Sequence, residues 1–379
     1  MSGGDPLLLT PGPLTTSASV KAAMLHDWGS RDETFIAMNR SVRERLVALA
    51  NGTGTHVAVP IQGSGTFAVE AMLGTFVPKG GRVLLLVNGA YGRRMADICR
   101  VIGRDAVVEE TAEDVPPDPA TVARLLAADP SIGHVAMVHG ETTAGILNPL
   151  AAIAQVVAAA GRRLLVDSMS AFGALPVDAR TMPFDALASS ANKCLQGVPG
   201  LAFVICREEA LAAAAGQAAS VSLDLHAQWR GMERDGQWRF TPPTHVVAAL
   251  QQAMDEHAAE GGVAARGARY ARNCQVLIEG MRRLGFRSLL PDALQAPIIV
   301  TFHMPTHPRF AFGRFYDALK DRGFVIYPGK LTKVDSFRIG CIGDLHEADM
   351  RAAVDAVAAV LGEMGVSLTG ENGGRAVAE

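Results

Sequence analysis

The sequence has few cysteines and almost no excess of charge, and each shortage argues against a class of protein. Its five cysteines are an odd number and contain no CxxC pair, which argues against a disulfide framework and a structural zinc site. We therefore expect buried, reduced cysteines and no bound metal. The net charge is -3 over 379 residues, without basic or acidic blocks, which argues against nucleic acid and anionic membranes as partners.

Long apolar runs are also absent. The uninterrupted ones, such as residues 83–87, have the length of a strand and fall far short of the roughly 20 residues that cross a bilayer. Residues 1–6 lack the basic start and apolar core of a secretion signal, so we expect a cytoplasmic protein. Hydrophobic residues are plentiful at 49%, and this content with this length predicts a large domain and a smaller one.

The hydrophobic pattern predicts an α/β fold. Between residues 55 and 207, apolar runs of strand length alternate with segments of helical period, as in a mostly parallel sheet covered on both faces. The predicted strands are 56–62, 82–88, 105–110, 134–139, 163–168, 185–189 and 201–207, and the predicted helices are 66–77, 91–102, 119–128 and 150–160. Long alanine-rich helices and short strands after Pro243 predict a second, α+β domain. We expect an N-terminal arm (1–20), a large domain with a seven-stranded sheet (21–250), a small domain (251–365) and a flexible tail (366–379).

Two polar residues at predicted strand ends give the strongest chemical signal. Asp167 ends the run 163–167, and Lys193 follows the next predicted strand, twenty-six residues later. This pair suits pyridoxal phosphate (PLP), because a lysine amine attacks the cofactor's aldehyde while a carboxylate keeps its pyridine nitrogen protonated. The segment around Lys193 carries little charge, and a desolvated pocket of this kind lowers the pKa of a lysine. Both residues are therefore candidate catalytic groups.

A phosphate site is predicted where the first strand meets its helix. Ser64, Gly65 and Thr66 would lie at a helix N-terminus, where backbone N–H groups and the helix dipole bind anions. The run from Gly63 also fits the dinucleotide fingerprint GxGxxA, which requires an acidic residue at the end of the next strand. That strand ends in Asn88 instead, which argues against a nicotinamide cofactor.

Further candidates follow from side-chain chemistry. Tyr91, at a helix start, offers an aromatic face for a flat cofactor. Arg338 offers a planar, charged fork for a carboxylate or phosphonate, or is a surface arginine on an exposed strand. Thr143 offers a hydroxyl to the cofactor, or caps a turn. Thr241, in a rigid proline turn, could carry a hydroxyl to a phosphate, and the N-terminal arm could line the mouth of the site.

Seven ordered segments resemble the class V aminotransferases of PLP fold type I. They are 10–13, 62–66, 88–92, 139–143, 166–170, 191–197 and 337–340, and the likeness extends over residues 7–362. Within this family the segments are most similar to the branch that acts on aminophosphonates. A cysteine usually precedes the glutamate of the fourth segment in that branch, where this chain has Gly140, and the missing side chain would widen that wall.

The resemblance implies a PLP enzyme that forms a homodimer with its active sites at the subunit boundary. The expected reaction moves the amino group of 2-aminoethylphosphonate to pyruvate, giving phosphonoacetaldehyde and L-alanine in phosphonate catabolism. The implied roles are catalysis by Lys193 and Asp167; cofactor binding by Ser64, Gly65, Thr66, Tyr91, Thr143 and, from the partner subunit, Thr241; and substrate binding by Arg338, Pro11 and Gly12.

Three alternatives remain open. An alanine–glyoxylate or serine–pyruvate type aminotransferase would keep the same catalytic residues and change the amino donor. A PLP-dependent ammonia-lyase would act on a hydroxylated aminophosphonate by elimination. The third, from a different class, is a non-catalytic protein of the PLP fold. The presence of both Lys193 and Asp167 argues against it, because binding alone has no chemical need for either.

Overall fold

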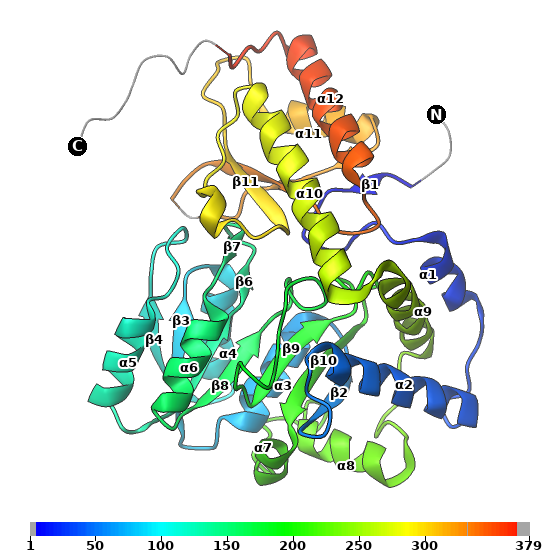
Figure 1. The fold of residues 1–379 in the computed structure, drawn as a ribbon, viewed down its shortest axis with the longest axis vertical. Coiled ribbons are helices and arrows are strands. Elements are labelled where there is room, and N and C mark those ends of the chain that lie inside the picture. The colour runs from blue at the N-terminus through cyan, green and yellow to red at the C-terminus, as the bar shows by residue number, and fades with distance from the viewer. Residues whose placement is uncertain (1–4, 332, 370–379) are drawn as a thin grey trace.

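The computed structural model describes residues 5–331 and 333–369, which form a large α/β domain with a smaller domain stacked against it (Figure 1). The large domain is built on a seven-stranded sheet in the order β2-β10-β9-β8-β5-β3-β4. β10 is antiparallel to β2 and β9, and the other adjacent strands are parallel. The predicted seven-stranded, mostly parallel sheet is thus confirmed. Its strands are β2 (His56–Gln62), β3 (Arg82–Val87), β4 (Asp105–Glu110), β5 (Ile132–Val138), β8 (Arg163–Asp167), β9 (Ala186–Ser190) and β10 (Leu201–Arg207).

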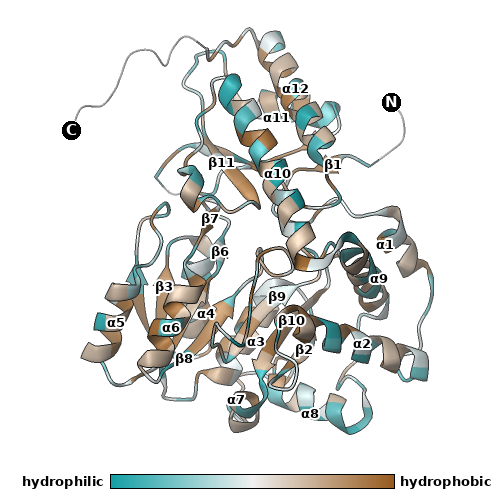
Figure 2. Cartoon of the chain, viewed as in Figure 1, coloured by the Kyte–Doolittle hydropathy of each residue, from teal (hydrophilic) through white to brown (hydrophobic). Residues whose placement is uncertain are grey.

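Helices cover both faces of this sheet. One face packs against α2 (Glu33–Leu49), α5 (Pro119–Ala128), α6 (Leu150–Ala159) and α9 (Thr244–Glu260). The other packs against α3 (Gly65–Phe76), α4 (Ala90–Val101), α7 (Glu208–Ala213) and α8 (Leu225–Asp235). Burial on both sides explains why the central strands are continuous apolar runs, and Figure 2 shows the hydrophobic residues gathered on them. No helix in the described part of the chain is both long and apolar enough to traverse a bilayer.

The sequence did not lead us to predict α2, although its signal is present. Phe35, Met38, Val42 and Leu46 are buried on one side of this helix, with the spacing of an amphipathic helix. Asp32 caps its N-terminus by accepting a hydrogen bond from Thr34 N at 2.9 Å.

The small domain contains a three-stranded antiparallel sheet in the order β11-β14-β13. Its strands are β11 (Ile299–His303), β13 (Tyr327–Pro328) and β14 (Ser336–Gly340), and its helices are α10 (Gly262–Arg283), α11 (Phe312–Asp321) and α12 (Glu347–Met364). β1 (Leu7–Leu8) pairs in parallel with β12 (Phe324–Val325) and so ties the N-terminal arm to this domain. The short elements α1 (Ala18–Ala22), β6 (Gly140–Glu141) and β7 (Ile146–Leu147) complete the fold, with two 3-10 turns at Ala23–Leu25 and Asp292–Leu294.

The helix packing indicates where the two domains meet. α9 packs on α2, whereas α10, which starts after Gly261, packs on α12. Leu9 lies in the small-domain core, as do Val366 and Leu368 from the start of the predicted tail. The predicted domain limits at 20, 250 and 365 stay predictions, and residues 370–379 of the tail lie outside the described residues.

The carboxyl ends of the parallel strands share one edge of the large sheet, which is where ligands bind in open α/β sheets. This edge faces the small domain, since Ala296 N of that domain donates to Gly145 O at 2.9 Å. The predicted site residues of the large domain follow these strand ends.

Candidate active site

A cavity of about 360 Å³ at this edge contains both residues of the predicted pair. Asp167 ends β8 and Lys193 follows β9, and both line the cavity. Ser64, Gly65, Thr66 and Tyr91 line it as well, as expected from the sequence. Six of the predicted residues therefore meet in one place.

Asp167 is a buried carboxyl whose pKa is raised to about 6, chiefly because burial disfavours its charged form. Met169 N donates to its Oδ1 at 2.9 Å and opposes this rise, as do the charges of Arg94 and Lys193. A protonated ring nitrogen beside Asp167 would favour the ionised form. The site is thus suited to a pyridinium.

Lys193 points towards the N-terminal arm. Its Nζ donates to Pro11 O at 2.8 Å, and burial lowers its pKa below the ordinary lysine value. Gly12 has φ +132°, and a Cβ added there would lie 2.3 Å from Lys193 Nζ. The arm therefore touches the reactive amine, and position 12 has neither the backbone nor the space for a side chain.

The N-terminus of α3 opens into the cavity and forms a cradle for an anion. Ser64 is the N-cap residue, yet its side chain makes no capping hydrogen bond. Arg94 Nη1, from α4, donates to Thr66 Oγ1 at 3.1 Å and brings a positive charge to this cradle. Ser190 also lines the cavity, and its buried Oγ has no hydrogen-bond partner among the described residues.

These groups fit PLP. The cavity volume of about 360 Å³ lies within the range of small-molecule sites. The unpartnered Ser190 hydroxyl, the uncapped start of α3 and Arg94 suit a phosphate, while Asp167 and Lys193 suit a ring nitrogen and an aldehyde. In the described part of the chain, no cluster of His, Cys, Asp and Glu is placed to hold a metal ion.

Two cations lie over the ring of Tyr91. The distances to its centroid are 4.9 Å from Arg94 Cζ and 4.2 Å from Lys330 Nζ, the latter in the small domain. Burial alone would raise the pKa of Tyr91, but hydrogen bonds with Thr142 and Lys330 and the charges of Lys330 and Lys193 outweigh it, and the pKa is lowered. The phenol thus lies in a strongly positive environment.

Thr143 does not line the cavity. It is fully buried. Its Oγ1 donates to Glu141 Oε1 at 2.6 Å, and the same Thr143 Oγ1 accepts from Ala90 N at 2.9 Å. Glu141 Oε2 in turn accepts from the first N–H groups of α4, at Tyr91 and Gly92. The neighbouring residue Thr142 lines the cavity instead. The cofactor contact implied for Thr143 stays a prediction, and the geometry favours Thr142 for it.

We expect Thr143→Val to lower the free energy of unfolding by about 1–3 kcal/mol, because it removes a donor from the buried Glu141. Turnover per folded molecule should change little. Thr142→Val is the matched control and should have the opposite profile, with lower activity and nearly unchanged stability. Denaturant unfolding and steady-state kinetics check this. A stable but inactive Thr143→Val variant would restore its assignment to the cofactor.

Arg338 lies on β14 and is buried. Its Nη1 donates to Thr142 O at 2.8 Å and its Nε to Pro328 O at 3.1 Å. Burial lowers its pKa, yet a guanidinium stays charged at neutral pH. Arg338 therefore lies directly behind a wall residue of the cavity rather than on an exposed strand face.

Thr241 lies outside the cavity of Lys193. It lines a second cavity of about 620 Å³. Gly63 lines both cavities, so the two are adjacent. Phe67 and Phe240 line this second cavity and are 47% and 52% exposed. Within one chain Thr241 does not join the other predicted site residues.

Ser170 fills the space beside Gly140. A Cβ at position 140 would lie 2.6 Å from Ser170 Oγ, which donates to Gly140 O at 2.7 Å. The expectation that Gly140 widens the wall is therefore wrong, because the serine hydroxyl takes the room that a side chain would need.

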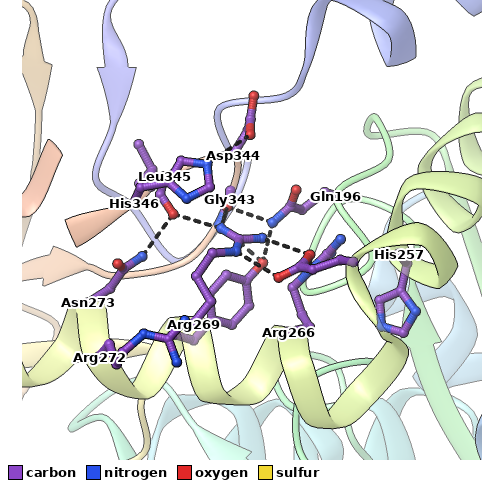
Figure 3. Close-up of polar contacts among 12 residues, drawn as sticks. Gln196, His257, Arg266, Arg269, Arg272, Asn273, Gly343, Asp344, Leu345 and His346 are labelled. Atoms are coloured by element: carbon purple, nitrogen blue, oxygen red, sulfur yellow. Dashed lines mark hydrogen bonds and ion pairs between the residues drawn. The ribbon is translucent and has the colours of Figure 1, made fainter. Parts of the chain in front are cut away.

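The loop that carries Lys193 is bound to α10 by buried polar contacts (Figure 3). Arg266 Nη1 donates to Cys194 O at 2.7 Å, and Gln196 Nε2 donates to Tyr270 OH at 2.6 Å. Gln196 has φ +61°, a strained value for a residue with a side chain. Helix α10 thus holds the residues that follow the catalytic lysine.

The same helix binds the loop after β14. Arg269 Nη1 donates to Gly343 O at 2.8 Å and to Leu345 O at 2.6 Å (Figure 3). Glu260 forms ion pairs with Arg266 and Arg269, at 2.5 and 2.8 Å. This network, which we name the α10 network, connects the lysine loop to the small domain.

Sequence reasoning missed four residues near Tyr91 and Lys193. Arg94 follows Tyr91 by three positions, a spacing that places both on one helix face. Ser190 precedes Lys193 by three positions, on the same strand exit. Thr142 is adjacent to Thr143, and both carry a hydroxyl that suits a cofactor contact. Lys330 comes from a distant loop, and the sequence holds no signal that would place it here.

Comparisons with known proteins agree with this geometry. The sequence profile described as "Aminotransferase class-V" matches residues 17–325. A 2-aminoethylphosphonate–pyruvate transaminase of Pseudomonas fluorescens is 58% identical over 366 residues, 97% of this chain and 99% of the relative. One of Pseudomonas aeruginosa is 56% identical over 361 residues, 95% and 97% of the two chains. The solved pyridoxamine–pyruvate aminotransferase of Mesorhizobium loti superimposes with a TM-score of 0.88 at 24% identity, over 97% and 95% of the two chains.

The chain belongs to the class V aminotransferases. It is a PLP-dependent aminotransferase with the α/β architecture of PLP fold type I.

Proposed function

We propose that this enzyme transfers the amino group of 2-aminoethylphosphonate to pyruvate, giving phosphonoacetaldehyde and L-alanine, as a step of phosphonate catabolism. Support comes from relatives of that name at 56–58% identity over nearly the whole chain. The structural observation that carries the proposal is the meeting of Lys193 and Asp167 in one cavity, with the guanidinium of Arg338 behind its wall.

Each residue of the site has a chemical task in this reaction. PLP, when bound, supplies an electron sink for the carbon atom that loses its proton. Lys193 Nζ, whose pKa is lowered by burial, removes that proton and returns it, as a general base must. Asp167 holds the proton on the ring nitrogen. Ser64, Gly65 and Thr66 bind the phosphate, and the aromatic face of Tyr91 orients the cofactor ring.

One anion site must serve both halves of the reaction. The amino donor carries a phosphonate and the acceptor a carboxylate, and a guanidinium fork matches either group. We assign this role to Arg338, with Pro11 and Gly12 at the mouth, where the arm reaches Lys193. The two half-reactions then proceed by ping-pong kinetics.

We further propose that the enzyme acts as a cytoplasmic homodimer. The exposed Phe67 and Phe240 beside Thr241 support a partner on this face, since exposed aromatic clusters favour protein contacts. Thr241 would then reach the phosphate of the partner's cofactor. Analytical ultracentrifugation tests the dimer, and a monomer at micromolar concentration would contradict it.

A panel of amino donors and acceptors tests the reaction. With PLP, 2-aminoethylphosphonate and pyruvate, alanine should form at the same rate as the aldehyde. Serine and alanine with glyoxylate test the other aminotransferase assignment. Release of ammonia without an acceptor would instead identify a lyase, and no turnover of the phosphonate would reject the proposal.

We expect Arg338→Lys to raise KM for both anionic substrates about 10- to 100-fold, because a charge-assisted pair of parallel hydrogen bonds is lost. The visible absorbance of the bound cofactor should persist. Arg314→Lys, at an exposed arginine of α11, is the matched control. Steady-state kinetics measure KM and kcat separately. An unchanged KM would mean that a residue other than Arg338 binds the substrate's anionic group.

A further inference from the structure

Tyr91 is the common neighbour of four positive side chains. Arg94 and Lys330 lie over its ring, at 4.9 and 4.2 Å from the centroid. Lys193 also lies near enough to help lower the pKa of the Tyr91 hydroxyl, and Tyr91 lies near enough to Arg338 to oppose the lowering of its pKa by burial. This is more positive charge than a single bound carboxylate needs.

Several of the nearby charges already have partners. Glu141 binds the N-terminus of α4, Asp167 is suited to the pyridinium, and Lys193 is committed to the cofactor's aldehyde. Arg94 donates to Thr66 in the phosphate cradle, which assigns its charge to the cofactor phosphate. Two cations, Arg338 and Lys330, are then left for the substrate.

These two cations are carried by one hairpin of the small domain. β13 pairs with β14, and Tyr327 lies opposite Arg338 in this pairing. Arg338 Nε donates to Pro328 O at 3.1 Å, two residues before Lys330. The backbone just before Lys330 is thus bonded to the guanidinium that we assign to the substrate.

Building on the proposed function, we propose that Lys330 is the second cation of the substrate's anion site and selects a doubly charged phosphonate over singly charged groups. A phosphonate resembles a phosphate monoester, whose second pKa is about 6, and so carries nearly two negative charges at neutral pH. A carboxylate or sulfonate carries one. Arg338 alone serves the single charge of pyruvate, and Lys330 adds its charge for the dianion.

The test compares two donors of one shape with different charge. 2-Aminoethylsulfonate has the spacing and tetrahedral head of 2-aminoethylphosphonate but a single negative charge. We expect Lys330→Met to lower kcat/KM for the phosphonate about 10- to 100-fold, while the inhibition constant of the sulfonate changes less than about threefold. Lys330→Arg should restore most of the phosphonate activity. Lys333→Met, an exposed lysine of the same loop, is the matched control and should behave as wild type.

A pH profile separates this role from a purely structural one. In the wild type, kcat/KM for the phosphonate should rise as the substrate takes up its second charge near pH 6, and in Lys330→Met this rise should flatten. If Lys330→Met weakens the phosphonate and the sulfonate equally, Lys330 only supports Tyr91 and the proposal is overturned. The proposal is also overturned if the substitution weakens neither.

A measurement without substrate keeps the placement of Lys330 independent of the proposed function. The positive charge of Lys330 contributes to the lowered pKa of Lys193. In cofactor-free Lys330→Met, the pKa of Lys193, measured from the pH dependence of its reductive methylation, should therefore rise. An unchanged pKa would overturn the placement. If the pKa rises but wild type fails to use the phosphonate, it is the proposed reaction that fails.

Discussion

Lys193→Ala should remove the visible absorbance of the lysine-bound cofactor and lower turnover by at least about 10³-fold, because it deletes both the nucleophile and the base. The residue lies in the main cavity, with its Nζ bonded to Pro11 O. Borohydride reduction of the wild type should fix the cofactor on a single peptide that contains Lys193, as mass spectrometry can show.

Lys79→Ala is the matched control, since Lys79 is exposed and surface lysines also react with aldehydes. This variant should keep both colour and rate. Added methylamine should partly rescue Lys193→Ala by supplying an amine to the vacated space. Turnover of Lys193→Ala near the wild-type rate would end the assignment of Lys193 as the base.

Asp167→Asn should lower kcat roughly 10²- to 10³-fold, as expected when a buried charge that supports the transition state is lost. The amide cannot hold the ring nitrogen in its protonated form. The cofactor should still attach, because Lys193 is intact. The exposed Asp97, whose side chain is 71% accessible, offers Asp97→Asn as the matched control, with wild-type kinetics.

The same substitution should stabilise the cofactor-free protein above about pH 6. Burial raises the pKa of Asp167 from 3.8 to about 6, so the folded chain binds more protons than the unfolded chain between these values. Stability from this group is complete below pH 4 and is lost as pH rises through 6. The loss is on the order of 3 kcal/mol at 1.36 kcal/mol per unit. Urea unfolding of both proteins at pH 4.5 and 8 should show the gap opening with pH, and a constant gap would contradict this assignment.

Much of the fold could be predicted from the sequence because the central strands are buried on both faces. β2 and β10 begin and end where the apolar runs do. The antiparallel course of β10 could not be predicted, because strand direction depends on tertiary pairing and leaves no mark on a continuous apolar run. Helix α2 was overlooked although its buried residues keep helical spacing.

The site residues also divide into those that local sequence predicts and those that only the tertiary fold places. Residues fixed by a strand end, such as Asp167, or by a helix start, such as Ser64, follow from local sequence. Thr142 and Thr143 differ by one position, and only the fold decides which hydroxyl faces the cavity and which one binds Glu141. Lys330 depends on how the small domain docks, which no local pattern encodes.

Because of the α10 network, substitutions far from the cavity can shift the loop that carries Lys193. Arg266 holds Cys194 O, next to the reactive amine, while Arg269, one turn further along, holds Gly343 and Leu345. Rotating the small domain about its junction would therefore strain the lysine loop. The position of Lys193 thus depends on α10, a helix that contributes no residue to the lining of the main cavity.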